Sequence, residues 1–171
     1  MPRALLLSGV AGVGKSTVAA AAGRILTAAG RATAVVDTDM LAQFGPPPAD
    51  RRFYDRLKCA NLAAVWANFE AAGARYVVVA AVIDSVSLRE MYAEHLAGCE
   101  VQLVGLTADD GTVRSRLQHR DTGQDLERHL RALKEHRPTA SVADFTVAND
   151  RAAADVAAEI LGRAGWADQV T

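Results

Sequence analysis

Residues 9–16 read GVAGVGKS and match the phosphate-binding pattern G-x-x-x-x-G-K-[ST] at every position. The run follows an apolar stretch at residues 3–8, which is typical of a strand buried on both faces, and precedes an alanine-rich helical stretch at residues 15–29. Glycines let the backbone wrap a phosphate so that N–H groups point inward, and the helix N-terminus adds partial positive charge. This stretch therefore predicts binding of a nucleoside triphosphate.

The residue types in this loop divide the contacts with such a ligand. Lys15 supplies a mobile cation for the β- and γ-phosphates, and the Ser16 hydroxyl suits Mg²⁺. We expect ATP and Mg²⁺ as cofactors, and the base-recognition motif N/T-K-x-D of GTPases is absent from the sequence. The expected nucleotide contacts are Gly9, Ala11, Gly12, Val13, Gly14, Lys15, Ser16 and Thr17.

Strand-like and helical segments alternate along the rest of the chain. Short apolar or β-branched runs at residues 3–8, 32–36, 76–83, 101–106 and 144–147 predict strands. Helical patterns separate them, and Thr107 with Asp110 resembles a capping box for the helix that carries Arg114. The alternation predicts an α/β fold: a five-stranded parallel sheet with helices on both faces, and a functional crevice beyond the carboxyl ends of the strands.

The composition excludes several other classes of protein. The chain has 171 residues, of which 50% are hydrophobic and 23% charged, and 19 basic residues nearly balance 20 acidic ones. These values exclude disorder and the basic footprint of a nucleic-acid-binding protein. Cys59 and Cys99 are too few for a disulfide framework or a zinc site, and no uncharged run approaches the ~18 apolar residues of a membrane span. We expect one domain over residues 1–171, in the cytoplasm, with no membrane or nucleic-acid partner.

Two carboxylates follow the second predicted strand. Asp37 and Asp39 flank Thr38 at a position that opens onto the same crevice as the phosphate loop. One can order a water in the Mg²⁺ shell, and the other can accept a proton from a substrate hydroxyl as it attacks the γ-phosphorus. The alternative is that an aspartate caps the segment that begins at Met40.

With this loop and acidic pair, the chain resembles the small P-loop phosphotransferases that include shikimate kinase, gluconate kinase, adenylylsulfate kinase and chloramphenicol phosphotransferase. The resemblance implies a three-layer P-loop NTPase fold with an acceptor-binding region at about residues 40–72 and an Arg-rich lid at about residues 115–137. It implies that Asp37 and Asp39 are catalytic, with Asp37 on the metal side and Asp39 toward the acceptor. Which aspartate is the base stays open.

Arginines crowd the segment between the fourth and fifth predicted strands. The resemblance implies that Arg114 stacks on adenine, Arg120 reaches the phosphates as a catalytic residue, and Arg137 contacts the acceptor. Arg151 falls in the loop that corresponds to the adenine side. The alternative is a solvated helical face, on which neighbouring acidic residues balance these arginines, and His129 is expected on the surface or in the lid.

The sequence features of the acceptor-binding region are less specific than the phosphate loop. Arg52 could hold an anionic acceptor or face solvent at a helix start, and Asp84 is a further candidate because it follows an apolar strand. The third predicted strand ends in Val82-Ile83-Asp84-Ser85, whereas a shikimate kinase should present a Gly-Gly-Gly segment there, so shikimate itself is disfavoured.

These features predict an ATP- and Mg²⁺-dependent kinase that phosphorylates a hydroxyl of a small metabolite or antibiotic-like molecule. One alternative is a nucleoside or nucleoside monophosphate kinase, with base contacts near Phe53 and Tyr54. Another is a regulatory protein that binds ATP without catalysis. The expected partner is a small-molecule hydroxyl acceptor, and the alanine-rich helix surface is compatible with a homodimer.

Overall fold

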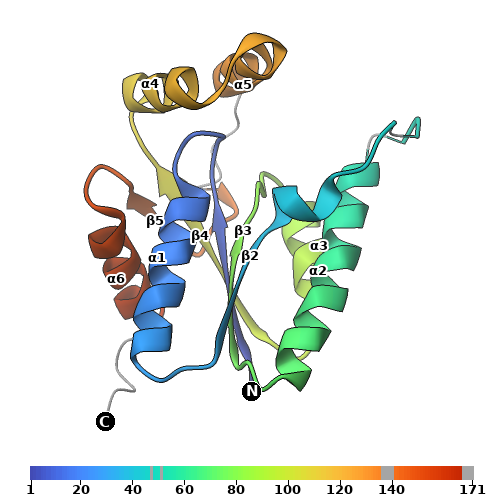
Figure 1. Ribbon diagram of the computed structural model, residues 1–171, viewed down its shortest axis with the longest axis vertical. Helices are drawn as coiled ribbons and strands as arrows, with labels where there is room; N and C mark the ends of the chain where they lie inside the picture. The colour runs from blue at the N-terminus through green and yellow to red at the C-terminus, as the bar shows by residue number, and fades with distance from the viewer. Residues whose placement is uncertain (47, 51, 136–140, 167–171) are drawn as a thin grey trace.

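The computed structural model describes the chain except for residues 47, 51, 136–140 and 167–171 (Figure 1). Its sheet is entirely parallel, in the order β2-β3-β1-β4-β5. The central strand β1 pairs Leu6 with Val79 on one side and with Leu103 on the other. The strands are β1 Arg3–Ser8, β2 Thr33–Asp37, β3 Tyr76–Ala80, β4 Glu100–Thr107 and β5 Phe145–Ala148. This arrangement confirms the predicted five-stranded parallel sheet.

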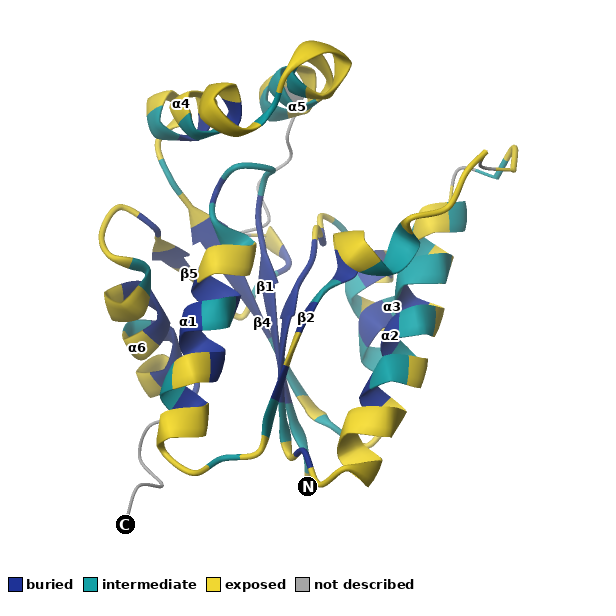
Figure 2. Ribbon diagram, in the orientation of Figure 1, coloured by how far each residue is buried: buried dark blue, intermediate teal, exposed yellow. Residues whose placement is uncertain are grey.

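Helices cover both faces of the sheet (Figure 1). Helices α1 (Lys15–Ala28) and α6 (Ala153–Arg163) lie on one face, and α2 (Phe53–Ala71) and α3 (Val86–His95) lie on the other. Because side chains alternate along each strand, Leu5 and Leu7 join the core under α1 while Leu6 joins the core under α2. The central strand β1 is therefore largely apolar and buried on both sides (Figure 2).

Two further helices lie beyond the carboxyl ends of the strands. They are α4 (Asp110–Arg120) and α5 (Gly123–Glu135), which stand above the phosphate loop in Figure 1. Asp109 caps α4 by accepting a hydrogen bond from the Thr112 amide at 2.8 Å. The predicted cap at Thr107 was therefore wrong, because β4 runs through that residue and the helix begins after Asp109.

The third strand ends earlier than its apolar run predicts. β3 stops at Ala80, which pairs with Asp37 at the end of β2, and residues 81–84 continue without a β2 partner. The Ser8 hydroxyl donates to the Ile83 carbonyl at 3.1 Å and accepts from its amide at 2.8 Å. This buried pair fixes the segment that carries Asp84 beside the end of β1.

None of the helices in the described part of the chain is both long enough and apolar enough to cross a bilayer.

Candidate active site

The phosphate loop between β1 and α1 is held open by glycines and by a polar anchor. Gly14 has a φ of 101°, a backbone conformation that glycine adopts readily. The carbonyl of the buried Val13 accepts hydrogen bonds from Asn149 Nδ2 at 2.7 Å and from Arg116 at 3.1 Å. The loop therefore depends on side chains that arrive from α4 and from the end of β5.

Gly14→Ala is expected to lower the free energy of unfolding by about 2–4 kcal/mol, because a Cβ at this position would lie 2.4 Å from Asn149 Nδ2 in a left-handed backbone. Gly30→Ala is the matched control, since Gly30 has a φ of 72° with nothing within 4 Å of the added Cβ, and should cost about 1–2 kcal/mol. Denaturant unfolding measures both. Equal losses in the two variants would contradict the close approach of Asn149 to the loop.

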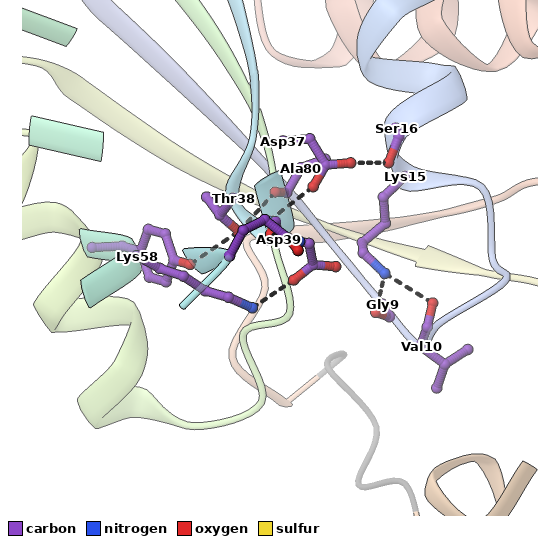
Figure 3. A network of polar contacts seen from close by, with 11 residues as sticks. Gly9, Val10, Lys15, Ser16, Asp37, Thr38, Asp39, Lys58 and Ala80 are labelled. Carbon is purple, nitrogen blue, oxygen red and sulfur yellow. Dashed lines mark hydrogen bonds and ion pairs between the residues drawn. The ribbon is translucent and has the colours of Figure 1, made fainter. Parts of the chain in front are cut away.

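Lys15 lies inside the loop that it is expected to serve. Its Nζ donates to the carbonyls of Gly9 and Val10, each at 2.9 Å (Figure 3). Burial lowers the pKa of Lys15 to about 8, although the negative charges of Asp39 and Asp37 oppose that shift. The ammonium is thus desolvated and aimed into the loop, where an anion would stabilise its charged form.

The two aspartates face different partners. Asp37 accepts a hydrogen bond from the Ser16 hydroxyl, and its other oxygen accepts from the Asp39 amide at 3.0 Å (Figure 3). That second bond caps the short 3₁₀ helix Thr38–Ala42, so Asp37 is a cap as well as a neighbour of Ser16. Asp39 instead pairs with Lys58 of α2 at 2.5 Å.

Thr38 fixes the direction in which the two carboxylates point. It is fully buried, its hydroxyl donates to the Ala80 carbonyl at 3.1 Å, and the Tyr92 hydroxyl donates to Thr38 Oγ1 at 3.4 Å. The backbone at this point is therefore tied to both β3 and α3. Because the Thr38 side chain points inward, the side chains of Asp37 and Asp39 on either side of it point into the cavity at the carboxyl ends of the strands (Figure 3).

Lys58 keeps Asp39 ionised. Burial by itself raises the pKa of Asp39, but the hydrogen bond and the positive charge of Lys58, together with the charge of Lys15, bring the pKa below its usual value. Lys58 falls within the predicted acceptor region, yet the sequence pattern assigned it no role. Its pairing depends on how α2 packs against the 3₁₀ helix, where Asn61 of α2 also donates to the Leu41 carbonyl at 2.6 Å.

A cavity of about 980 Å³ joins the loop to the acidic pair. Most of the predicted site residues line it: Ala11, Gly12, Gly14, Lys15, Ser16, Thr17, Asp37, Asp39, Asp84 and Arg120. Val82, Arg116 and His129 line it too, although no site role was predicted for them. Gly9 and Val13 belong to the loop backbone without lining the cavity.

The structure places other predicted residues elsewhere. Arg114 is exposed on α4 and does not line the cavity, whereas Arg116, two residues later, donates to Val13 and to the Asn149 carbonyl at 3.2 Å. Arg151 pairs with Glu159 of α6. A helix turns by 100° per residue, so residues two apart lie on opposite faces of α4. Arg137 lies outside the described residues.

Arg52 lies at a smaller cavity of about 190 Å³, which also contains Asp55 and Asp84. Its guanidinium donates to the Ser87 hydroxyl at 3.3 Å. Burial raises the pKa of the Asp55 carboxyl, and the nearby charge of Asp84 acts in the same direction. Asp84 lines both cavities, so Arg52 is adjacent to the main cavity without lining it.

The donor atoms at Ser16 and Asp37 suit a magnesium ion. A hydroxyl and a carboxylate are hard oxygen ligands, and Mg²⁺ is commonly bound by one or two such groups together with phosphate oxygens and waters. Among the described residues, no group of at least three His, Cys, Asp or Glu side chains could form a metal cage by itself. The residues therefore fit a metal that arrives with a phosphate ligand.

The loop, the strand order and the flanking helices define a P-loop protein with a kinase-like fold. Comparison with known protein families matches residues 5–137 to the AAA domain, and the chain belongs to that family. No curated protein matches the sequence significantly.

Three of the similar solved structures are kinases. APS kinase CysC of Mycobacterium tuberculosis, in complex with AMPPNP and APS, is 22% identical over 96% of this chain and 98% of its own, with a TM-score of 0.67. A gluconokinase from Sinorhizobium meliloti is 24% identical over 99% and 94%, with a TM-score of 0.61. Shikimate kinase from Acinetobacter baumannii, in complex with shikimate, is 18% identical over 99% and 96%, with a TM-score of 0.66. At these identities the likeness shows a shared fold.

Proposed function

We propose that this protein is a kinase that transfers the γ-phosphoryl group of ATP, with Mg²⁺, to a hydroxyl of a small molecule. The observation that carries the proposal is the single cavity in which Lys15, Ser16, Asp37 and Asp39 converge. A phosphate loop alone serves many reactions, but a carboxylate pair across the cavity adds the groups that an alcohol acceptor needs.

The nucleotide end is formed by the loop and by Ser16 with Asp37. When bound there, Mg²⁺ and ATP would supply the phosphoryl group and neutralise its charge. Lys15 would exchange its bonds to Gly9 and Val10 for phosphate oxygens, which are better partners for a desolvated ammonium. Asn149 and Arg116 keep the Val13 carbonyl engaged, so that the loop holds its shape.

The acceptor end is formed by Asp39 and by the segment that carries Val82 and Asp84, and Lys58 supports Asp39 from behind. Asp39 accepts a hydrogen bond from the attacking hydroxyl and then its proton. Its lowered pKa suits this order, because phosphoryl transfer is largely dissociative and the hydroxyl becomes acidic only as the new O–P bond forms. Lys58 pairs with Asp39 from outside the cavity lining and holds it in place.

The molecules bound to similar structures support a small acceptor. APS occupies the Mycobacterium tuberculosis structure and shikimate the Acinetobacter baumannii one. The residues expected to contact a nucleoside do not line this cavity: the Phe53 ring packs 5.3 Å from that of Phe44, and the Tyr54 hydroxyl donates to the Phe44 carbonyl at 2.8 Å. Because Phe53 and Tyr54 lie away from the cavity, we favour a non-nucleoside acceptor, even though APS is itself an adenylyl compound.

The test is incubation of the purified protein with ATP, Mg²⁺ and pooled sugars, polyols, aromatic alcohols, nucleosides and hydroxylated antibiotics. Mass spectrometry should find one acceptor class that has gained a phosphoryl group, and the gain should disappear when Mg²⁺ is chelated. Binding of ATP without a product from any pool would contradict the kinase proposal and favour a regulatory ATP-binding role.

The affinity for MgATP is expected to fall about tenfold between pH 7 and pH 9. The pKa of Lys15 in the free protein is about 8, and phosphate oxygens favour its charged form, so binding is strongest while Lys15 is protonated and weakens as the pH rises above 8. Calorimetric titration across this range measures the change. Lys15→Met should bind weakly at both pH values without this dependence, and an equally steep fall in that variant would show that another group is responsible.

A further inference from the structure

A polar cluster on α4 and α5, formed by Arg120, Asp121 and His129, faces the main cavity, and the mechanism above uses none of its members. Arg120 ends α4 and His129 lies in α5, and both line the cavity together with Lys15 and the two aspartates. Between them is Asp121, the first residue after α4. Asp121 does not line the cavity, and its side chain is only 11% exposed.

Asp121 holds both neighbours at once. Its Oδ1 accepts from Arg120 Nε at 2.7 Å and its Oδ2 accepts from another guanidinium nitrogen at 3.0 Å, which forms a bidentate pair. The same Oδ2 lies 2.6 Å from His129 Nδ1. Hydrogen bonds and the charge of Arg120, supplemented by His129, lower the pKa of Asp121 to about 2, so the carboxylate stays ionised.

This arrangement determines which atoms remain for a ligand. Nε and one terminal nitrogen of Arg120 donate to Asp121, so the other terminal nitrogen is not used by that pair. His129 faces Asp121 through Nδ1, so Nε2 is the ring nitrogen available to a partner. Arg120 interacts electrostatically with Lys15, and His129 with Asp39, across the cavity.

We propose that Asp121 is a positioning residue that aims Arg120 and His129 together at the phosphoryl group in transit, with His129 as a second ligand-contacting residue on the α4–α5 side of the cavity. The proposal rests on the proposed kinase function. Arg120 then supplies fixed positive charge and His129 Nε2 supplies a polar contact, while Asp121 sets the geometry of both without touching the substrate. Because both side chains bind the same carboxylate, both are oriented before the substrate binds.

The first test does not depend on activity. In the free protein, nitrogen NMR of the His129 ring should show Nδ1 as the protonated nitrogen in a hydrogen bond, and the Arg120 Nε proton should exchange slowly. Asp121→Asn should remove both signatures. Asp125→Asn is the matched control on α5, because Asp125 pairs with the exposed Arg128 at 3.1 Å and does not line the cavity. Unchanged signatures in Asp121→Asn would overturn the proposal.

The second test separates positioning from folding. Asp121→Asn should lower kcat about ten- to a hundredfold, with the KM for ATP changed less than about threefold, while Asp125→Asn matches the wild type. Adding Asp121→Asn to Arg120→Ala should slow the enzyme by much less than it slows the wild type, since part of its effect acts through Arg120. Equal kcat values for Asp121→Asn and Asp125→Asn, or fully additive losses, would overturn this proposal alone. A wild type that transfers no phosphoryl group would overturn the kinase proposal and this one with it.

Discussion

Lys15→Met is expected to lower kcat/KM for ATP about a hundred- to a thousandfold, which is the cost of removing one preorganised charge from a phosphoryl-transfer site. Lys15 is the cation of the loop and lines the cavity. Its Nζ donates to the carbonyls of Gly9 and Val10, and phosphate oxygens would take their place as its hydrogen-bond partners. Methionine keeps a similar length and apolar stem. The loss should therefore come from charge and hydrogen bonding with little change in packing.

Stability should respond much less than activity. The ammonium of Lys15 is costly to bury, as its lowered pKa shows, so its removal offsets the loss of two hydrogen bonds. We expect the free energy of unfolding to change by about 1 kcal/mol or less. Lys134→Met, on the exposed last turn of α5, is the control for replacing a lysine and should leave both properties unchanged. Activity of Lys15→Met within tenfold of the wild type would contradict the role of the loop.

The acidic pair should show two different defects. Asp39→Asn is expected to lower kcat about a hundred- to ten-thousandfold, because it removes the group that we propose receives the hydroxyl proton. Asp37→Asn should instead raise the Mg²⁺ concentration needed for half-maximal rate, because Asp37 accepts from Ser16 and the two are the proposed magnesium ligands. Steady-state rates over a range of Mg²⁺ concentrations distinguish the two.

The control for this pair is Asp155→Asn, an equal loss of charge in the exposed first turn of α6. It should match the wild type in rate and in Mg²⁺ requirement. If excess Mg²⁺ restored Asp39→Asn but not Asp37→Asn, the division of roles would be reversed. If both variants kept wild-type rates, neither aspartate would take part in the reaction.

The fold could be predicted because its signals are local. A strand buried on both faces is a continuous apolar run, and the phosphate loop is a contiguous pattern between a strand and a helix. The end of β3 could not be predicted in this way, because residues 76–83 are apolar throughout while the strand stops where β2 ends. Strand length here is set by the neighbouring strand, which the run itself does not encode.

The loop and the acidic pair were also predictable, whereas their supports were not. Asp37 ends β2 and Asp39 comes two residues later, so both reach the crevice by topology alone. Lys58, Asn149 and Arg116 reach it only because separate elements pack in one particular way. The rotation of α4 about its axis places Arg116, and not Arg114, at the cavity. A sequence pattern with no flanking motif cannot fix that rotation to within two residues.

The sequence of α4 and α5 says least about which of its side chains face the site. Its charged residues fit a solvated surface as well as a lid, and only the spatial pairing of Asp121 with Arg120 and His129 separates the inward groups from the rest. The predicted lid at about residues 115–137 stays a prediction, and its last residues lie outside the described part of the chain.

The most direct test of the central claim follows a label from ATP. The protein is incubated with Mg²⁺, the acceptor pool and ATP labelled either in the γ-phosphoryl or in the α-phosphoryl group. We predict that the γ label alone becomes covalently attached to a small molecule, and that Lys15→Met and Asp39→Asn abolish the attachment. Transfer of the α label, or γ label recovered only as inorganic phosphate, would show that the protein is not a kinase of small hydroxyl acceptors.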